Sequence, residues 1–575
     1  MYPERSIMKR RITAFILIQV LILSLCACRN ADRSVIPGTG VPGVPGVPEW
    51  DAYDSLLKEA SVEADVEKRS LLMHQAEDML MDTGAVIPLY HASWYYMAPE
   101  NVRNVYLTPG NILWIRGMEV AGQDGSVPVK VCVCTEIPSL DPLGTQAADL
   151  SQMTAIISAG LLMYDQNGDI VEDLAESYQV SDDGLTYTFR LRDGLRWSDG
   201  TRLSAEDFVY TWKYAASTER GSEVGPMFEV IKGYPDDLCV SASPDGKVFT
   251  VELENPCTYF TSLCTFSAFT PLQKKQIEEA PGYRDGSGRI VNASAWATEA
   301  GFASCGAYTC ESWKHNESIV LKKNPYFYDA DHVKTEKLEM MLSSDSTIAY
   351  SAYQSGDITV LLRNVPADIL PSLFDSPEFH SKSSLSTYYF LFNVNSDLFD
   401  GMTAEEAATF RKAVGMCFDR QFIVDVGLQN GSVPAVTYLP PNINDGTGNP
   451  FEYENKGYYD IRPDLPGARE LLKSIGFEFN SEGKLKKPIC LEYLSPGTAA
   501  NSSVAACLQA DLAEIGINMT VNAMEWAVYL GEKKNPENEC LYGAWIADYD
   551  DPYGMLFLFT TDAAMNDASL GLEIK

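Results

Sequence analysis

The chain of 575 residues carries 79 acidic and 44 basic side chains, which gives a formal net charge of −35 at pH 7. This charge repels nucleic acid and anionic lipid headgroups, so it argues against a nucleic-acid partner and indicates a soluble surface. At this length, with 46% hydrophobic residues, we expect two or more globular units, each with its own core.

A signal peptide is predicted at the N-terminus. Three basic residues at 9–11 precede an apolar run over residues 12–27, which is too short for a comfortable membrane span. The run ends in Leu-Cys-Ala-Cys28, which resembles a bacterial lipobox and implies that Cys28 becomes the lipidated first residue of the mature protein. A plain secretory signal is the alternative. Residues 1–27 are thus assigned to a lipoprotein signal peptide, and the Pro/Gly/Val-rich residues 28–47 to a flexible tether.

Apolar periodicity predicts the elements that follow the tether. Residues 53–60 and 72–80 show helical spacing, and a strand is expected at 85–90. Further strands, the last two each preceded by an Asp-Gly turn, are expected at 129–135, 187–192 and 248–253. Further helices are expected at 206–214, 405–416, 468–475 and 504–515. The pattern is that of a mixed α/β chain without tandem repeats.

Eleven cysteines follow Cys28, an odd number that cannot pair completely. Strand alternation puts Cys132 and Cys134 on one face, an arrangement too extended for an easy disulfide. Cys305 and Cys310 are the other close pair. No second pair or His-x-x-x-His follows Cys132 and Cys134 at ligand spacing, so the sequence predicts neither a metal site nor a bound cofactor. We expect many of these cysteines to be small buried apolar residues.

Eight short segments, in consistent order, resemble the family-5 solute-binding proteins, the oligopeptide- and dipeptide-binding lipoproteins of ABC importers. The segments are Ser139-Leu-Asp-Pro142, Asp173-Leu-Ala-Glu-Ser-Tyr178, 185–200, 205–212, 323–327, 387–389, 411–413 and Trp545-Ile-Ala-Asp-Tyr-Asp-Asp-Pro552. The series covers nearly everything after residue 48. The resemblance implies an α/β, two-lobed periplasmic-binding-protein-like fold of type II, with the ligand cleft between the lobes.

The order of the segments departs from the family. Residues 48–103 are similar to the part that normally follows the Trp-Ile-Ala-Asp-Tyr motif, yet here they come first. We interpret this as a circular permutation in which residues 121–126 join the family's usual ends; a neighbouring gene's tail or a truncated tandem copy is the alternative. The expected domains are then 48–98, a displaced segment of lobe II, 99–385, lobe I, and 386–575, the remainder of lobe II.

Two crossings between the lobes are expected, near residues 98–104 and near residues 383–387. These crossings are the candidate hinge strands. Closure about them would trap a ligand between the lobes.

The resemblance also implies the binding residues. In the family the peptide lies between the lobes as an extra strand, bonded to the backbone of both. By position, the backbone groups belong to Ala544 and Ile546 in lobe II and to Gln146, Ala147 and Ala148 in lobe I. An acidic side chain is needed for the peptide α-ammonium, which loses water when the lobes close.

Asp548 is the family's candidate for that acid; alternatively it is one of three acids in a polar turn with Asp550 and Asp551. Tyr388 and Tyr389 would line the cleft, with core aromatics of a strand as the rival interpretation. Trp545 would wall a side-chain pocket or brace the motif.

The function implied is that of the extracytoplasmic substrate-binding subunit of a peptide ABC importer, a binding protein rather than an enzyme. Its expected partners are short peptides and the permease subunits. We expect a monomer, lipid-anchored to the cell membrane in the periplasm or at the outer face of a Gram-positive cell. Gly-x-Ser-x-Gly, His-Glu-x-x-His and P-loop patterns are absent from the sequence. The alternatives are the same fold binding a nickel chelate, haem or an oligosaccharide, and a secreted hydrolase that uses paired acids or a cysteine.

Overall fold

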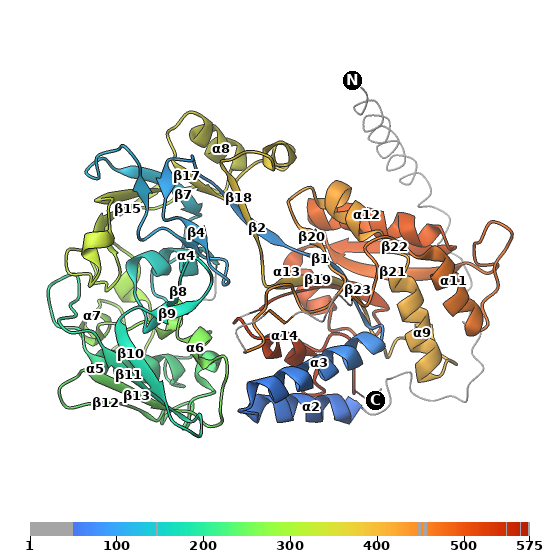
Figure 1. The fold of residues 1–575 in the computed structure, drawn as a ribbon, viewed down its shortest axis with the longest axis horizontal. Helices are drawn as coiled ribbons and strands as arrows, with labels where there is room; N and C mark the ends of the chain where they lie inside the picture. The colour runs from blue at the N-terminus through green and yellow to red at the C-terminus, as the bar shows by residue number, and fades with distance from the viewer. Residues whose placement is uncertain are drawn as a thin grey trace.

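The computed structural model describes residues 50–144, 148–446, 450–451, 457–547, 549–563 and 565–572. Two lobes are joined by two extended segments, which include strands β2 and β18 (Figure 1). Lobe I contains sheets of seven and four strands, and lobe II contains a sheet of six strands. The α/β, two-lobed fold expected from the sequence is confirmed.

The larger sheet of lobe I runs in the order β14 (Tyr308–Lys314), β15 (Ser318–Lys323), β16 (Lys337–Leu342), β7 (Val129–Cys134), β17 (Val360–Leu362), β2 (Ser93–Met97) and β18 (Phe379–Ser383). β7 is parallel to both of its neighbours. Val131 and Val133 face the main core of the lobe, while Cys132 faces a smaller cluster that includes Tyr350 of α8 (Ser346–Gln354). The two faces of the strand are therefore both buried, which explains its nearly continuous apolar run.

The smaller sheet of lobe I consists of β10 (Ala175–Val180), β11 (Thr186–Leu191), β13 (Val248–Glu252) and β12 (Val240–Ala242). Helix α5 (Ala205–Ala216) packs on it through Trp212, which is fully buried and meets Phe249 edge-on at 4.8 Å between ring centroids. A capping box between Ser204 and Asp207 begins this helix.

The sheet of lobe II runs in the order β20 (Val433–Pro434), β1 (Val86–His91), β19 (Ser386–Phe392), β23 (Cys540–Ile546), β21 (Ile489–Pro496) and β22 (Ile517–Met524). Successive residues of β19 face opposite layers. Phe392 meets Phe410 of α9 (Ala404–Gly415), and Tyr389 meets Phe559, which follows α14 (Tyr553–Leu556).

The four later helices expected from the sequence are present as α5, α9, α11 (Leu465–Ser474) and α12 (Ala499–Ala513). Helix α12 begins five residues earlier than expected because Thr498 accepts a hydrogen bond from the Asn501 amide and caps it there. The chain leaves α12 at Gly516, where φ is +88°. No helix among the described residues is long and apolar enough to cross a membrane.

Several shorter elements matter for the site described below. The remaining helices used below are α4 (Ala148–Ile157), α6 (Phe260–Leu263) and α13 (Trp526–Glu532). The two-stranded ladders are β3 (Val102–Arg103) with β6 (Glu119–Val120), β4 (Tyr106–Leu107) with β5 (Leu113–Trp114), and β8 (Leu162–Tyr164) with β9 (Ile170–Glu172). Cys132, Cys134, Cys305 and Cys310 are buried and form no disulfide.

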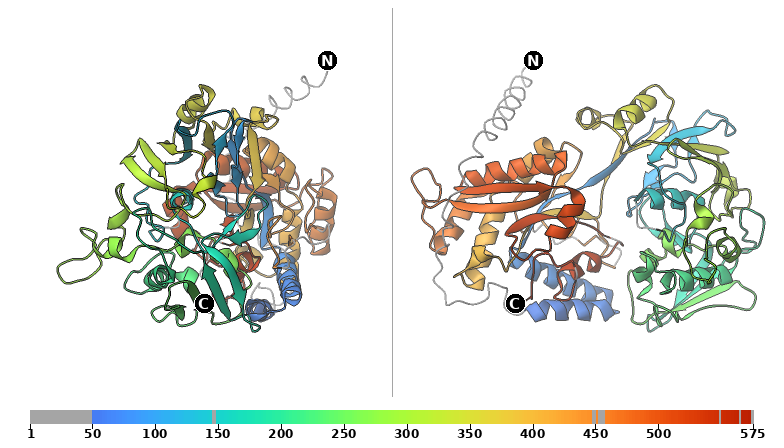
Figure 2. Two further views of the ribbon diagram at one scale, coloured as in Figure 1. Left: turned by 60° about the vertical axis from the view of Figure 1, so that its left-hand side comes forward. Right: turned by 180° about the vertical axis from the view of Figure 1, so that it is seen from behind.

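The N-terminal segment over residues 50–91 packs into lobe II. Its helices α2 (Trp50–Val62) and α3 (Val66–Asp82) lie against α14 at the base of this lobe (Figure 2). Tyr53 is fully buried, and its hydroxyl donates to the Leu556 carbonyl at 2.6 Å. Strand β1 then enters the sheet between β19 and β20. The segment thus supplies an internal strand and a helical layer to a lobe whose other parts begin at residue 386.

The first crossing between the lobes lies earlier than expected. Residues 93–97, which we assigned to the displaced part of lobe II, form β2 in the sheet of lobe I, where they pair with β17 and β18. The chain therefore crosses at Ala92 rather than near 98–104. The second crossing follows Ser383, within the expected range, and the Ser384 amide donates to the Ala92 carbonyl at 2.8 Å.

The two ends of the described fold meet. The Trp50 indole donates to the Phe559 carbonyl at 2.8 Å, and a β-carbon added at Gly571 would lie 2.6 Å from Trp50 Cδ1. We propose that the chain order is a circular permutation of the family order, because ends in contact can be joined without moving either lobe.

A reordered chain tests this proposal. Residues 127–572 followed by a short linker and residues 50–120 should fold to the same two lobes, with a similar thermal unfolding midpoint by circular dichroism. Deleting residues 50–91 should instead abolish the cooperative unfolding of lobe II, because Tyr53 and its neighbours then leave a core face uncovered. A deletion that unfolds like the parent protein would contradict the proposal.

A buried carboxyl in α3 gives the second prediction. Glu77 is 1% exposed and accepts a hydrogen bond from the Leu439 amide at 2.9 Å. Burial raises the pKa of Glu77 to about 7. The folded state therefore holds this proton in a pH range where the unfolded chain has released it, and the free energy of unfolding should fall as pH rises from about 4.5 to about 7. Glu77→Gln cannot ionise and should lack this fall, of up to about 3 kcal/mol.

Chemical denaturation of both proteins at several pH values measures this difference. Glu67→Gln is the control, since Glu67 is exposed on the same helix. The stability of Glu77→Gln relative to the parent should rise with pH, while that of Glu67→Gln should not. Parallel pH curves for Glu77→Gln and the parent would show that Glu77 titrates normally in the folded protein.

Candidate ligand-binding site

The end of β23 presents a backbone edge beside which no strand lies among the described residues. β23 pairs with β19 along its whole length, and the Ala547 amide continues the ladder by donating to the Leu385 carbonyl at 2.7 Å. Alternate residues of a strand direct their backbone groups to opposite sides, so odd-numbered residues here face β19. Ala544 and Ile546 therefore direct their N–H and C=O groups to the other side.

On that other side, within the described residues, β21 pairs with β23 only at Cys540 and Leu541. The Tyr542 carbonyl accepts a hydrogen bond from the Tyr529 hydroxyl of α13. Ala544 and Ile546 extend past this point, and the Ile546 residue is 47% exposed. This edge can accept an extended chain as an additional strand.

Two tryptophans lie near the edge. Trp526 begins α13, is 52% exposed and stacks on Tyr529 at 5.8 Å between ring centroids. Trp545 is half-buried, and its buried Nε1 has no acceptor among the described residues. A buried donor without a partner is uncommon, and an acceptor on a bound ligand would satisfy it. We did not single out Trp526 from the sequence; an aromatic pair spaced i, i+3 directly after a strand was the available signal.

Tyr388 and Tyr389 point to opposite faces of the sheet, so they do not line one surface together. Tyr388 is half-buried and stacks on Tyr90 at 4.6 Å. Tyr389 is 7% exposed, lies over Gly543 and meets Tyr438 at 5.6 Å. Tyr389 is therefore a core residue of lobe II, as the rival interpretation has it.

The two acids that follow the Trp-Ile-Ala-Asp-Tyr motif, Asp550 and Asp551, both accept hydrogen bonds from other residues of the protein. Asp551 is 2% exposed and forms a two-pronged ion pair with Arg69 of α3, at 2.7 and 2.8 Å. Asp550 accepts a hydrogen bond from the Asn444 amide at 2.8 Å, and burial raises its pKa to about 6. Arg69 was not predicted as part of the site, because its partner is 482 residues away in the sequence.

The same turn touches lobe I. Tyr549 stacks on Tyr259 with 4.1 Å between ring centroids, and the Thr258 hydroxyl donates to Asp551 at 3.3 Å. The Asp550 amide donates to the Ser262 hydroxyl of α6 at 3.3 Å. The residues that follow the open edge therefore form a contact between the lobes.

On the lobe I side, Ala148 is exposed at the first position of α4. The preceding Leu-Asp-Pro turn is fixed by Asp141, which is 1% exposed and accepts hydrogen bonds from Arg220 and Ser294, both at 2.7 Å. Asp548, Gln146, Ala147 and Cys28 lie outside the described residues, as do the signal peptide and the tether. Within the described ranges, no group of three His, Cys, Asp or Glu side chains could hold a metal ion.

Comparisons with known proteins place the chain in a family. Residues 169–567 match the model of the bacterial extracellular solute-binding proteins, family 5. The oligopeptide-binding protein OppA of Bacillus subtilis is 29% identical over 70% of this chain and 71% of its own length. The dipeptide-binding protein DppE of the same organism is 28% identical over 68% of this chain and 69% of its own length.

A solved structure has the same fold. Listeria monocytogenes OppA bound to peptide superposes with a TM-score of 0.55 at 24% identity, over 78% of this chain and 86% of that one. The family match, which spans more than half of the chain, shows that this protein is a member of the family-5 bacterial extracellular solute-binding proteins.

Proposed function

We propose that this protein captures short peptides between its two lobes, without chemical turnover, as the extracytoplasmic substrate-binding subunit of an ABC importer. The observation that carries the proposal is the open backbone edge at Ala544 and Ile546, in a family whose relatives OppA and DppE are named for oligopeptide and dipeptide binding. A protein that accepts many peptides must bind what all peptides share, and a strand edge offers hydrogen bonds to the peptide backbone.

The peptide α-ammonium needs a carboxylate once closure removes its water. Asp551 is committed to Arg69, and Asp550 to the Asn444 amide. This leaves Asp548 as the remaining acid of the motif, and we assign it the α-ammonium. Gln146, Ala147 and Ala148 would supply backbone groups from lobe I, so that the peptide bridges the lobes.

Closure would occur about the two crossings at Ala92 and Ser384. The two crossings are joined by the hydrogen bond from the Ser384 amide to the Ala92 carbonyl, and Asn111 of lobe I donates to the Ser384 hydroxyl at 2.9 Å. Two adjacent crossings allow rotation of one lobe against the other with little change elsewhere. Attachment through a lipid on Cys28 would keep this monomer at the cell membrane, within reach of the permease subunits.

Isothermal titration calorimetry of the domain from residue 48 onward tests peptide binding. Pools of two- to five-residue peptides should bind saturably and be recovered intact. A sugar or metal chelate that binds saturably, with no heat from any peptide pool, would overturn the proposal in favour of another solute.

Asp548→Ala tests the amine anchor. Loss of the carboxylate leaves a buried ammonium without its partner, so binding of free-amine peptides should weaken by roughly 2 to 5 kcal/mol. N-acetylated peptides carry no ammonium and should lose far less. Equal losses for acetylated and free peptides would show that Asp548 acts in the fold rather than in binding.

Ile546→Pro tests the backbone edge. Proline removes the N–H that faces the open side while the ladder to β19 keeps its bonds, so binding of all peptides should weaken with a small change in the melting temperature. Ala547→Pro is the matched control, because its N–H donates to Leu385 within the ladder and its loss should lower the melting temperature. Unchanged peptide affinity in Ile546→Pro would exclude this edge as the binding surface.

A further inference from the structure

Lobe I contains a cavity of about 110 Å³ that is separate from the strand edge of lobe II. One wall is the segment 108–116, whose even-numbered residues face inward. Other walls are one side of α4, with Ser151 and Ala155, strand β8, and residues 265–270. An apolar cavity of about 150 Å³ can hold benzene, so this volume suits a group the size of an amino-acid side chain.

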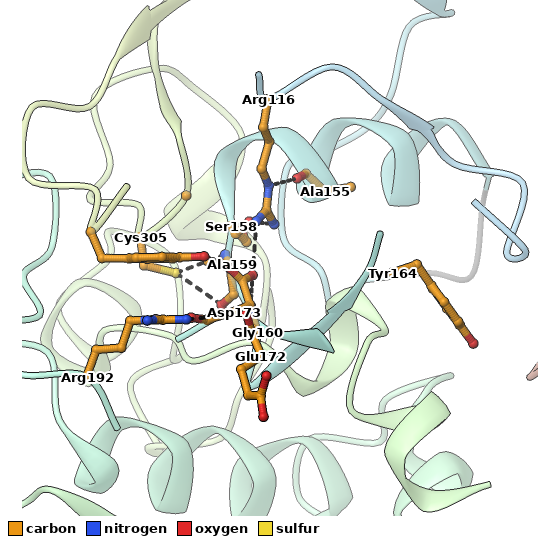
Figure 3. Close-up of polar contacts among 12 residues, drawn as sticks. Arg116, Ala155, Ser158, Ala159, Gly160, Tyr164, Glu172, Asp173, Arg192 and Cys305 are labelled. Atoms are coloured by element: carbon orange, nitrogen blue, oxygen red, sulfur yellow. Dashed lines mark hydrogen bonds and ion pairs between the residues drawn. The ribbon is translucent and has the colours of Figure 1, made fainter. Parts of the chain in front are cut away.

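Two of the residues that line the cavity, Arg116 and Asp173, form an ion pair, and Figure 3 shows its contacts. Arg116 and Asp173 are 7% and 0% exposed, and Arg116 Nη1 lies 2.9 Å from Asp173 Oδ2. Arg116 also donates to the carbonyls of Ala155, at 2.7 Å, and Ser158. Both charges are therefore already compensated by protein groups.

Asp173 has further partners. The Gly160 amide donates to Oδ2 at 3.1 Å, and the Tyr328 hydroxyl donates to Oδ1 at 2.9 Å. The Arg116 guanidinium in turn lies 4.2 Å from the centre of the Trp114 ring. With each charge already paired, a charged ligand group would lose its water here without gaining an opposite charge.

The apolar part of the lining favours apolar contact. Ile112, Trp114, Leu162, Met163 and Phe266 line the cavity, and the lining surface is mainly apolar. An uncharged apolar group therefore gains most from entering, because its apolar surface is removed from water.

The cavity lies beside the proposed peptide path. Ser151 is one helical turn along α4 from Ala148, the lobe I residue proposed to contact the peptide backbone. On its other side, Tyr164 lines the cavity and its hydroxyl lies 2.7 Å from Ser262 Oγ. Ser262 accepts from the Asp550 amide, so the cavity adjoins the contact between the lobes.

We propose that this cavity is a specificity pocket that takes one uncharged, apolar side chain of the bound peptide, of about leucine size, and rejects acidic and basic side chains. The proposal rests on the peptide-binding function proposed above and adds a selection rule to it. Selection arises because burial of apolar surface against the lining favours binding of an apolar side chain. The Arg116–Asp173 pair leaves no unpaired charge to bind an acidic or basic one.

The test is a calorimetric series with alanine peptides in which one position at a time carries Ala, Leu, Asp or Lys. At one position leucine should bind at least about tenfold more tightly than alanine, and aspartate and lysine should bind more weakly than alanine. Ser151→Leu fills the cavity and should remove the advantage of leucine over alanine. Ala155→Leu, on the same side of α4, should do the same.

Ser351→Leu is the matched control, because Ser351 is exposed on α8 and lies outside the cavity. It should keep the parent's preference, and melting temperatures should verify that every variant is folded. If peptides bind but no position prefers leucine, or if the filled variants keep the preference, the pocket assignment is wrong and peptide binding stands. If no peptide binds the parent protein, the proposed function fails and the pocket assignment fails with it.

Discussion

The buried ion pair between Arg69 and Asp551 joins the parts of this molecule that the chain order separates. Arg69 uses both terminal nitrogens on the carboxylate and its Nε on the Ala60 carbonyl, at 3.0 Å. Removal of one partner from such a pair costs about 3 to 5 kcal/mol, because the other charge stays buried without compensation. Helix α3, the motif turn at residues 549–551 and, through Thr258, lobe I all meet at this contact.

The pair also connects the stability of lobe II to the binding surface. Asp551 is three residues beyond Asp548 and five beyond Ile546, so the turn that follows the open edge has its position set by a helix from the other end of the chain. Strand β1 likewise helps to fix the sheet of lobe II, because β19 would be an edge strand without it. The displaced segment is therefore part of the framework that holds the candidate site.

The sequence predicted local features well where local chemistry decides them. The α9 helix was expected from its pattern, and Thr403 and Glu406 form its capping box. Ala544 and Ile546, chosen from the motif around them, lie on the unpaired side of β23 among the described residues, and their role in binding stays a prediction. The crossing at Ala92 was not predicted. Strand β2 is rich in aromatic residues and resembles β1 directly before it, so no change in composition marks the point where the chain passes from one lobe to the other. The sequence did not show which of Tyr388 and Tyr389 belongs to the core. Strand β19 is covered on both faces, so it lacks the alternation of apolar and polar residues that would separate the two sides. The cavity at Arg116 and Asp173 joins segments 57 residues apart, which no local pattern reveals.

The separation of Trp50 and Tyr53 from their partners, by 509 and 503 residues, has a consequence for biosynthesis. Helices α2 and α3 are made first, yet the residues near 551–559 against which they pack are made last. At about 5 to 20 residues per second, the 482 residues between Arg69 and Asp551 take on the order of 25 to 100 s to synthesise. Lobe I, which is continuous from residue 93 to residue 383, can be completed during that interval. The apolar face of α2 and α3 can therefore be covered only after the residues near 551–559 have been made, so the N-terminal segment is among the last parts of lobe II to dock.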